Sequence, residues 1–76
     1  MYYKVKRKLM VRRGIGVYVS YGISAYDERG KRIMHFPDLC TEKKKVRIFC
    51  EKLNALKPST VHMEEIVEDF LVDCLQ

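Results

Sequence analysis

Residues 15–26 read Ile-Gly-Val-Tyr-Val-Ser-Tyr-Gly-Ile-Ser-Ala-Tyr, a stretch in which apolar residues occupy every second position. The odd-numbered positions hold Ile15, Val17, Val19, Tyr21, Ile23 and Ala25. The even-numbered positions hold Gly16, Tyr18, Ser20, Gly22, Ser24 and Tyr26. Successive side chains of a strand point to opposite faces, so this period of two predicts a strand over about 15–27 with its odd-numbered face buried.

A second strand is predicted over about 2–12, before this stretch. Its apolar positions, interrupted by Arg7, are Tyr3, Val5, Leu9 and Val11. Its basic positions are Lys4, Lys6, Lys8 and Arg12. The Arg13-Gly14 step between the two strands is typical of a hairpin connection, because glycine readily adopts the positive φ of a tight turn.

A third strand is predicted over about 31–36, after a glycine-containing turn at residues 27–30. Its inward face is ambiguous, because Ile33 and His35 alternate against Met34 and Phe36. Pro37 has no N–H to donate to a sheet, so we expect strand pairing to stop there.

From Thr41 onward the apolar residues recur with the period of a helix. One helix is predicted over about 42–56, capped by Thr41 and ended by Pro58, and another over about 60–75, capped by Ser59 or Thr60. Their apolar stripes are Val46, Phe49, Cys50, Leu53 and Leu56, and Met63, Ile66, Val67, Phe70, Leu71 and Cys74.

The order of these elements predicts an α+β fold, a three-stranded antiparallel β-meander followed by two helices packed on one face of the sheet. We expect a single domain over 1–76, because a chain this short has room for one core. Both helical stripes must share the sheet, so Phe49 and Phe70 are predicted to be central core residues.

Composition and cysteine usage indicate a folded cytoplasmic protein. The chain is 47% hydrophobic and 33% charged, and it lacks a long apolar run or a signal-peptide pattern. Cys40, Cys50 and Cys74 are odd in number and widely spaced, without a metal-binding motif. We therefore expect Cys50 and Cys74 to be small buried hydrophobes in a reducing compartment, and no metal or cofactor.

The net charge of +5 is distributed unevenly along the chain. Residues 1–57 carry all fifteen Lys and Arg residues and five acids, a net charge of +10, whereas residues 58–76 carry five acids and no Lys or Arg. This asymmetry is typical either of a protein with an anionic partner or of a domain with two oppositely charged surfaces.

The sequence contains no recognised catalytic motif, so we expect a protein that is not an enzyme. No G-x-S-x-G element is present, and Gly14-Ile15-Gly16 is too short for a phosphate-binding G-x-G-x-x-G loop. His62, Glu65, Asp69 and Asp73 fall along one flank of the predicted second helix. We interpret them as a solvated acidic face in preference to a metal or acid–base site.

The second face of the predicted sheet is the candidate binding surface. Its members, if the first two strands pair, are Lys4, Lys6, Lys8, Arg12, Tyr18, Ser20, Ser24 and Tyr26. Cations and aromatic rings together bind phosphates and bases in single-stranded nucleic-acid platforms. The alternative, which we favour, is that the lysines protect an edge strand from aggregation.

The chain contains several short motifs that belong together: Tyr21-Gly22-Ile23, Asp38-Leu39-Cys40, Pro58-Ser59 with His62, and Glu68-Asp69-Phe70-Leu71. On these motifs the chain resembles a family of small, uncharacterised proteins of clostridial-type Firmicutes, classed as a domain of unknown function. The similarity spans nearly the whole chain from Tyr18. It implies a small bacterial cytoplasmic protein and transfers no catalytic residue.

Taken alone, the sequence favours an interaction or self-association module that forms at least a weak homodimer. A three-stranded sheet has two edges, and the third strand is the edge better suited to pairing, because the first is rich in lysine. The alternative function is a nucleic-acid-binding module that uses Lys4, Lys6, Lys8, Arg12, Tyr18 and Tyr26. No membrane partner is expected.

Overall fold

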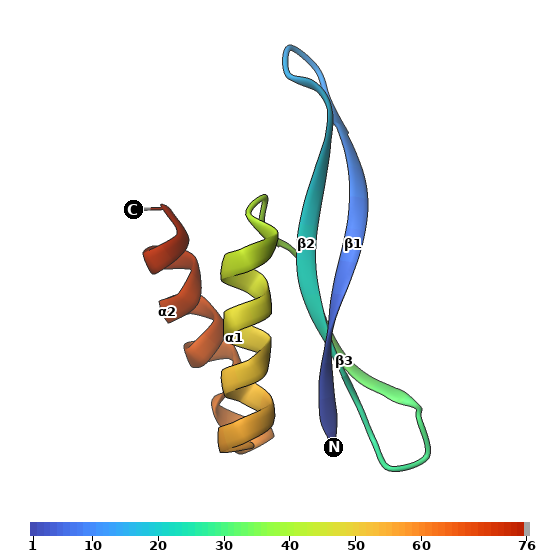
Figure 1. The fold of residues 1–76 in the computed structure, drawn as a ribbon, viewed down its shortest axis with the longest axis vertical. Coiled ribbons are helices and arrows are strands. Elements are labelled where there is room, and N and C mark those ends of the chain that lie inside the picture. The colour runs from blue at the N-terminus through green and yellow to red at the C-terminus, as the bar shows by residue number, and fades with distance from the viewer. Residues whose placement is uncertain (76) are drawn as a thin grey trace.

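The computed structural model describes residues 1–75 and shows the predicted α+β arrangement (Figure 1). Three antiparallel strands form one sheet in the order β1-β2-β3. The elements are β1 (Tyr2–Arg12), β2 (Gly16–Tyr26), β3 (Arg32–Cys40), α1 (Lys43–Leu56), the 3-10 helix η1 (Thr60–His62) and α2 (Met63–Leu75). Within residues 1–75, no helix has the length and apolar character needed to cross a membrane.

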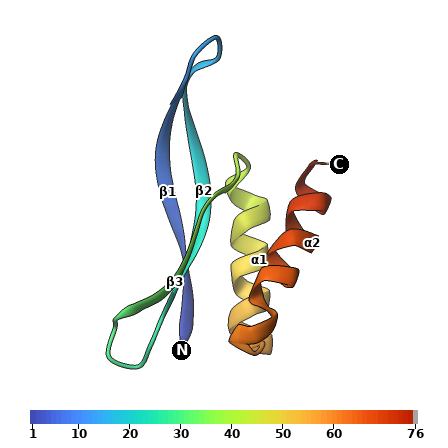
Figure 2. The ribbon, with the colours of Figure 1, turned by 180° about the vertical axis from the view of Figure 1, so that it is seen from behind.

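The core lies between one face of the sheet and the helices. It is formed by Tyr3, Ile23, Ala25, Leu39, Cys40, Val46, Cys50, Leu53, Met63 and Val67. The helix α1 packs against all three strands, and α2 lies beside α1 and contacts β3 (Figures 1 and 2). The start of α2 also reaches β1, because the Tyr3 hydroxyl donates a hydrogen bond to the Met63 sulfur at 3.6 Å.

The β1–β2 hairpin is longer than the helices that cover it, and its tip extends beyond them (Figure 1). We call residues 8–19 the arm. Val5 and Ile23 lie opposite each other beneath the helices, whereas Leu9 and Val11 of the same face are 63% and 73% exposed. The prediction that the whole apolar face is buried is therefore wrong for the arm, because the two helices do not reach along a hairpin of two eleven-residue strands.

Pro37 does not end β3, contrary to the prediction of a strand over 31–36. Pairing with β2 resumes at Cys40, which lies opposite Tyr21, after a shift of register. Residues 37–39 form a bulge, and Asp38 adopts a left-handed conformation with φ 57°. The bulge accommodates the proline, because it removes the need for a ladder hydrogen bond at that position.

Gly22 makes room for this bulge. A Cβ atom at Gly22 would overlap the Phe36 carbonyl oxygen and lie 2.8 Å from the Pro37 Cα. The pairing also settles the ambiguous face of β3, because Met34 and Phe36 pack against the core and His35 lies opposite Ser24 on the other face.

The boundaries of α1 agree with the prediction of about 42–56, whereas α2 begins at Met63 because residues 60–62 form the 3-10 helix η1. The predicted cap of α1 is wrong. The N-cap of α1 is Glu42, it makes no side-chain capping bond, and Thr41 precedes it. At the second helix, the Ser59 hydroxyl accepts a hydrogen bond from the Val61 N–H at 3.4 Å. Ser59 therefore caps the 3-10 helix η1 that leads into α2, and not α2 itself.

Three residues of the predicted apolar stripes are not buried against the sheet as expected. Leu56 is 78% exposed, because it lies in the last turn of α1. Phe49 and Phe70 are half-buried and not central: they stack on each other between α1 and α2, with ring centroids 4.3 Å apart. The reason is that α2 lies beside α1 instead of sharing the sheet equally with it.

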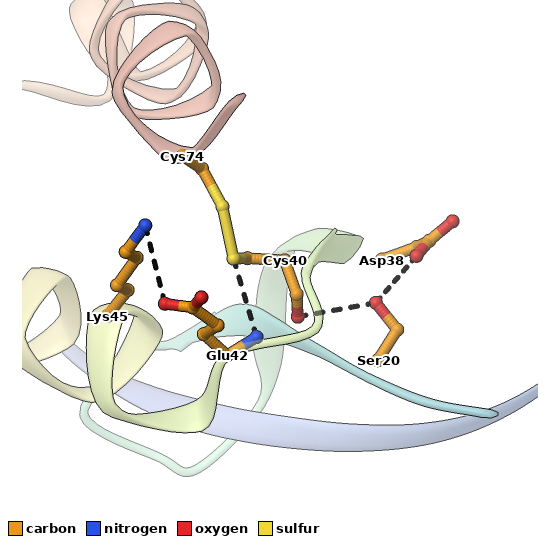
Figure 3. Close-up of a disulfide and its surroundings, with 6 residues drawn as sticks. All are labelled: Ser20, Asp38, Cys40, Glu42, Lys45 and Cys74. Atoms are coloured by element: carbon orange, nitrogen blue, oxygen red, sulfur yellow. Dashed lines mark hydrogen bonds and ion pairs between the residues drawn. A yellow bond between two sulfur atoms is a disulfide. The ribbon is translucent and has the colours of Figure 1, made fainter. Parts of the chain in front are cut away.

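Cys40 and Cys74 form a disulfide, which overturns the prediction that Cys74 is a free buried hydrophobe (Figure 3). The last turns of α2 lie near the end of β3, where the two Cα atoms are 6.6 Å apart, within the range that a disulfide bridges. Spacing in the sequence did not indicate this proximity. Cys50 is a free, buried thiol, as predicted.

Candidate functional site

The structure places all six predicted binding residues on the face of the sheet opposite the helices. We call this surface the open face. In the β1–β2 register, Lys4 lies opposite Ser24, Lys8 opposite Ser20, and Arg12 opposite Gly16. Because side chains of paired residues point to the same face, Lys4, Lys6, Lys8 and Arg12 share it with Tyr18 and Tyr26.

At one end of the open face, aromatic rings and ammonium groups are interleaved. Tyr2 and Tyr26 stack with centroids 5.4 Å apart. The Lys4 ammonium lies 5.5 Å from the Tyr2 centroid, and the Lys6 ammonium lies 5.1 Å from that of Tyr26. These distances fall within cation–π range, so the rings help to hold the cations in place.

At the other end, the positive charge is balanced by an acid from β3. The Arg12 guanidinium lies 3.7 Å from one Asp38 carboxylate oxygen, and the Ser20 hydroxyl donates to the other at 2.5 Å. The bulge at residues 37–39 brings Asp38 onto this face, beside Tyr18 and Arg12. Arg12 is therefore already paired within the chain.

A recess of about 270 Å³ lies between these two ends. The residues lining it are Lys6, Arg7, Lys8, Gly22, Tyr26, Arg32, His35, Pro37 and Asp38. Its floor is backbone, because the Phe36 carbonyl and the Pro37 Cα occupy the position that a side chain at Gly22 would take. Four Lys or Arg residues and a single acid therefore surround one small volume.

His35 is fixed within this recess by Ser24. The hydroxyl of Ser24, a fully buried residue, forms a hydrogen bond with His35 Nδ1 at 2.7 Å. This bond orients the ring, and Nε2 is the ring nitrogen that is left to contact a ligand. Partial desolvation lowers the pKa of His35, and the nearby charges of Arg32, Lys8 and Lys6 lower it further. Three neighbouring cations thus disfavour the protonated form of the His35 ring.

The pKa of Tyr26 is lowered as well, by two of the same cations, Lys6 and Arg32. Its hydroxyl group interacts with the Lys6 ammonium, and this hydrogen bond is the main reason that the pKa of Tyr26 is lowered. A positively charged neighbour favours the phenolate form of a tyrosine, just as it disfavours the imidazolium form of a histidine. Both groups therefore indicate a local excess of positive charge.

Sequence reasoning missed Arg32 and His35 as members of this face, because the inward side of β3 was ambiguous. Asp38 was also missed, since the strand was expected to end before it. The available signal was Gly22: a glycine inside an otherwise regular strand often marks a close backbone approach.

His62 lies in η1, and it forms an exposed flank with Glu65, Asp69 and Asp73 of α2. Among residues 1–75, no group of three or more His, Cys, Asp or Glu side chains is arranged to hold a metal ion. Behind this flank, a groove of about 450 Å³ separates α1 from α2. Ile48, Ile66 and the Phe49–Phe70 stack contribute its apolar lining.

The arm is the second surface without a partner. Its exposed apolar residues are Leu9, Val11, Ile15 and Val17, which are 63%, 73%, 70% and 64% exposed. All four were expected on the buried face of the sheet. Four exposed apolar side chains together on a protruding hairpin are typical of an interaction site.

Comparison with known proteins adds no functional assignment. No protein-family model, curated protein or solved structure matches the chain. The resemblance to the clostridial family therefore stays a prediction, and function has to be argued from the two surfaces described above.

Proposed function

We propose that this protein is a non-enzymatic interaction module that binds a second copy of the same chain through its arm. The observation that carries this proposal is the exposed apolar face of the arm, formed by Leu9, Val11, Ile15 and Val17. Burying these side chains in an interface is favourable, because each removes apolar area from water.

The charges around this face argue against pairing of two arms. Residues 8–19 contain no acid. The exposed Arg7 precedes the arm at a position of its apolar face, and the exposed Arg13 lies in the turn at its tip, whereas Lys8 and Arg12 belong to the open face. Two arms placed together would bring these cations close to one another. A surface complementary to the arm therefore has an apolar centre surrounded by acidic side chains.

The exposed side of α2 has that composition. Val72 is 56% exposed and follows Glu68 and Asp69 by four and three residues, so the three side chains share one face of the helix. Glu65 extends the same face by a further turn. The uneven charge of the chain is explained if the arm of one copy packs on α2 of another.

The direct test is the oligomeric state of the intact protein. We expect sedimentation velocity to show association that increases with concentration. Replacing two arm residues together, Leu9→Ser and Val11→Ser, is expected to weaken association about tenfold or more. A matched control is Leu56→Ser with Val61→Ser, two equally exposed residues outside the arm. A wild-type protein that stays monomeric at high micromolar concentration would refute self-association.

A charge exchange identifies the two contacting surfaces. One variant carries Arg7→Glu and Arg13→Glu in and beside the arm, and the other carries Glu68→Arg and Asp69→Arg on α2. Each variant alone is expected to be monomeric, and an equal mixture is expected to associate. If both variants self-associate as the wild type does, or if the mixture stays monomeric, α2 is not the partner of the arm.

A nucleic-acid-binding module is the second candidate, and the stacked Tyr2–Tyr26 pair with Lys4 and Lys6 favours it. Exposed rings beside cations provide stacking surfaces and phosphate contacts for a single strand. We expect Lys4→Glu, Lys6→Glu and Lys8→Glu together to abolish a weak affinity for single-stranded DNA or RNA that decreases with added salt.

The control for this experiment makes the same change of charge on the opposite side of the molecule. Lys43→Glu, Lys44→Glu and Arg47→Glu alter three exposed residues of α1. An equal loss of nucleic-acid affinity in both triple variants would show that binding depends only on the net charge of the protein. Absence of binding by the wild type at low salt would leave the lysines as protection of the β1 edge.

A further inference from the structure

We propose that the recess on the open face binds a phosphate group through Lys6, Lys8, Arg32 and His35. This inference goes beyond the proposed self-association, because none of these residues belongs to the apolar face of the arm. The ligand chemistry is the phosphate itself, which a free phosphate compound and a nucleic-acid backbone share.

The first argument is that the recess is built by the backbone. Gly22 leaves a floor without a side chain, and the bulge at residues 37–39 forms one wall. Its volume of about 270 Å³ is close to the lower end of small-ligand sites, ~300 Å³. The space therefore suits a phosphate group with a small substituent.

The second argument is the surplus of cations. The only acid lining the recess, Asp38, is already bound by Arg12 and Ser20. Within residues 1–75, the two ion pairs are Arg12–Asp38 and Lys45–Glu42, so neither involves a lysine of the recess or Arg32. A phosphate supplies the negative charge that the chain does not place there.

The third argument is the orientation of His35. Ser24 holds the ring through Nδ1, which leaves Nε2 to donate to a phosphate oxygen once the ring is protonated. The charged and polar groups that line the recess or contact the ring are Lys6, Arg7 and Lys8 from β1, Ser24 and Tyr26 from β2, and Arg32 and Asp38 from β3. A bound anion among these cations favours the imidazolium form, so phosphate binding and protonation of His35 are coupled.

The experiment is an NMR pH titration of the His35 ring in the full chain, with inorganic phosphate or with sodium chloride at equal ionic strength. Phosphate is expected to raise the pKa of His35 by about half a unit or more above its value in chloride. The chloride sample accounts for simple screening of the cations. An equal pKa in the two salts would overturn the proposal.

Variants then locate the site. Lys6→Gln with Arg32→Gln is expected to weaken phosphate binding about tenfold or more. The control, Lys43→Gln with Lys44→Gln, removes the same charge from α1 and is expected to leave binding unchanged. Equal weakening by both pairs would mean diffuse attraction to a basic protein, and the recess would not be a site.

Three further probes distinguish a free phosphate compound from a nucleic-acid backbone as the source of the phosphate. Thymidine 5′-phosphate is expected to bind and thymidine is not, and equal binding of the two would contradict the phosphate assignment. An oligothymidylate that binds much more tightly than the mononucleotide identifies a nucleic-acid backbone as the source. Similar affinity of the two identifies a free phosphate compound. The arm variants Leu9→Ser and Val11→Ser are expected to retain phosphate binding, which separates this proposal from self-association.

Discussion

The side-chain amide of Asn54 pairs with both backbone groups of Tyr3. Its Oδ1 accepts a hydrogen bond from the Tyr3 N–H at 2.7 Å, and its Nδ2 donates to the Tyr3 carbonyl at 3.0 Å. A residue of α1 thereby satisfies backbone groups at the outer edge of β1, as a neighbouring strand would. This contact ties the first strand of the sheet to a helix more than fifty residues later.

Replacing this amide is expected to destabilise the fold. Asn54→Leu removes both hydrogen bonds and leaves the Tyr3 backbone groups without these partners, at an expected cost of about 1–3 kcal/mol in the free energy of unfolding. Urea unfolding measures the change. Lys52→Leu, at an exposed position of the same helix, is the control and is expected to stay within about 0.5 kcal/mol of the wild type.

Gly22→Ala is expected to be destabilising although alanine is small. The added methyl group would meet the backbone of Phe36 and Pro37, which cannot rotate away as a side chain can. We expect a loss of about 1–3 kcal/mol in unfolding free energy, as for overpacking. Gly14→Ala is the comparison, because its Cβ meets no atom within 4 Å and tests only the positive φ of 86°. A Gly22 variant as stable as the wild type would contradict the close approach of β3.

Reduction of the Cys40–Cys74 bridge is expected to lower stability. The bridge joins residues separated by 34 positions, and a loop of that size corresponds to about 2–4 kcal/mol. Thermal unfolding with and without a reducing agent measures the difference, and Cys40→Ser with Cys74→Ser is expected to reproduce the reduced midpoint. Thiol titration of the unreduced, denatured chain should detect Cys50 alone. Three reactive thiols would show that the bridge is missing.

Phe49 and Phe70 are expected to be energetically coupled. Their rings are stacked in parallel, with an interplanar angle of 5°. A double-mutant cycle with Phe49→Leu and Phe70→Leu should give a coupling of about 0.5–1.5 kcal/mol. Phe49→Leu paired with Val72→Ala is the control, because Val72 lies on the exposed side of α2. Additive effects of the two phenylalanine variants would contradict the stack.

Stability is expected to decrease as the pH falls below about 6.5, through His35. The pKa of His35 is lowered in the folded state, so over this range the unfolded chain binds more protons than the folded chain does. The effect develops as the pH falls from 6.5 toward the folded-state pKa and is complete below that value. Urea unfolding of the wild type and His35→Gln should show a difference that changes through this window. His62→Gln, at an exposed position, is the control. A constant difference would contradict the lowered pKa.

The sequence was sufficient to predict elements whose side chains follow one clear period. The alternation at residues 15–26 and the helical stripes around Val46 and Val67 led to the correct strands and helices. It was also sufficient to place Lys4, Lys6, Lys8 and Tyr26 on one face, since alternation is a local property of a strand.

The errors arose where a contact depends on residues far apart in the chain. Periodicity predicts the length of each helix but not where along the hairpin the helices pack, so the exposure of Leu9 and Val11 was missed. The bulge after Pro37 requires the empty space at Gly22 on the preceding strand, and the Cys40–Cys74 bridge depends on the position of α2. These are properties of the assembled fold and not of any one segment.

The bridge requires Cys40 to pair with Cys74 and not with Cys50, which is nearer in the sequence. During synthesis Cys40 and Cys50 emerge before Cys74, so in an oxidising environment Cys50 is the first cysteine with which Cys40 can form a disulfide. Folding of α1 against the sheet buries Cys50, and burial raises the pKa of its thiol, which lowers the fraction of reactive thiolate. The same packing that forms the core thus protects one thiol until the correct pair can close.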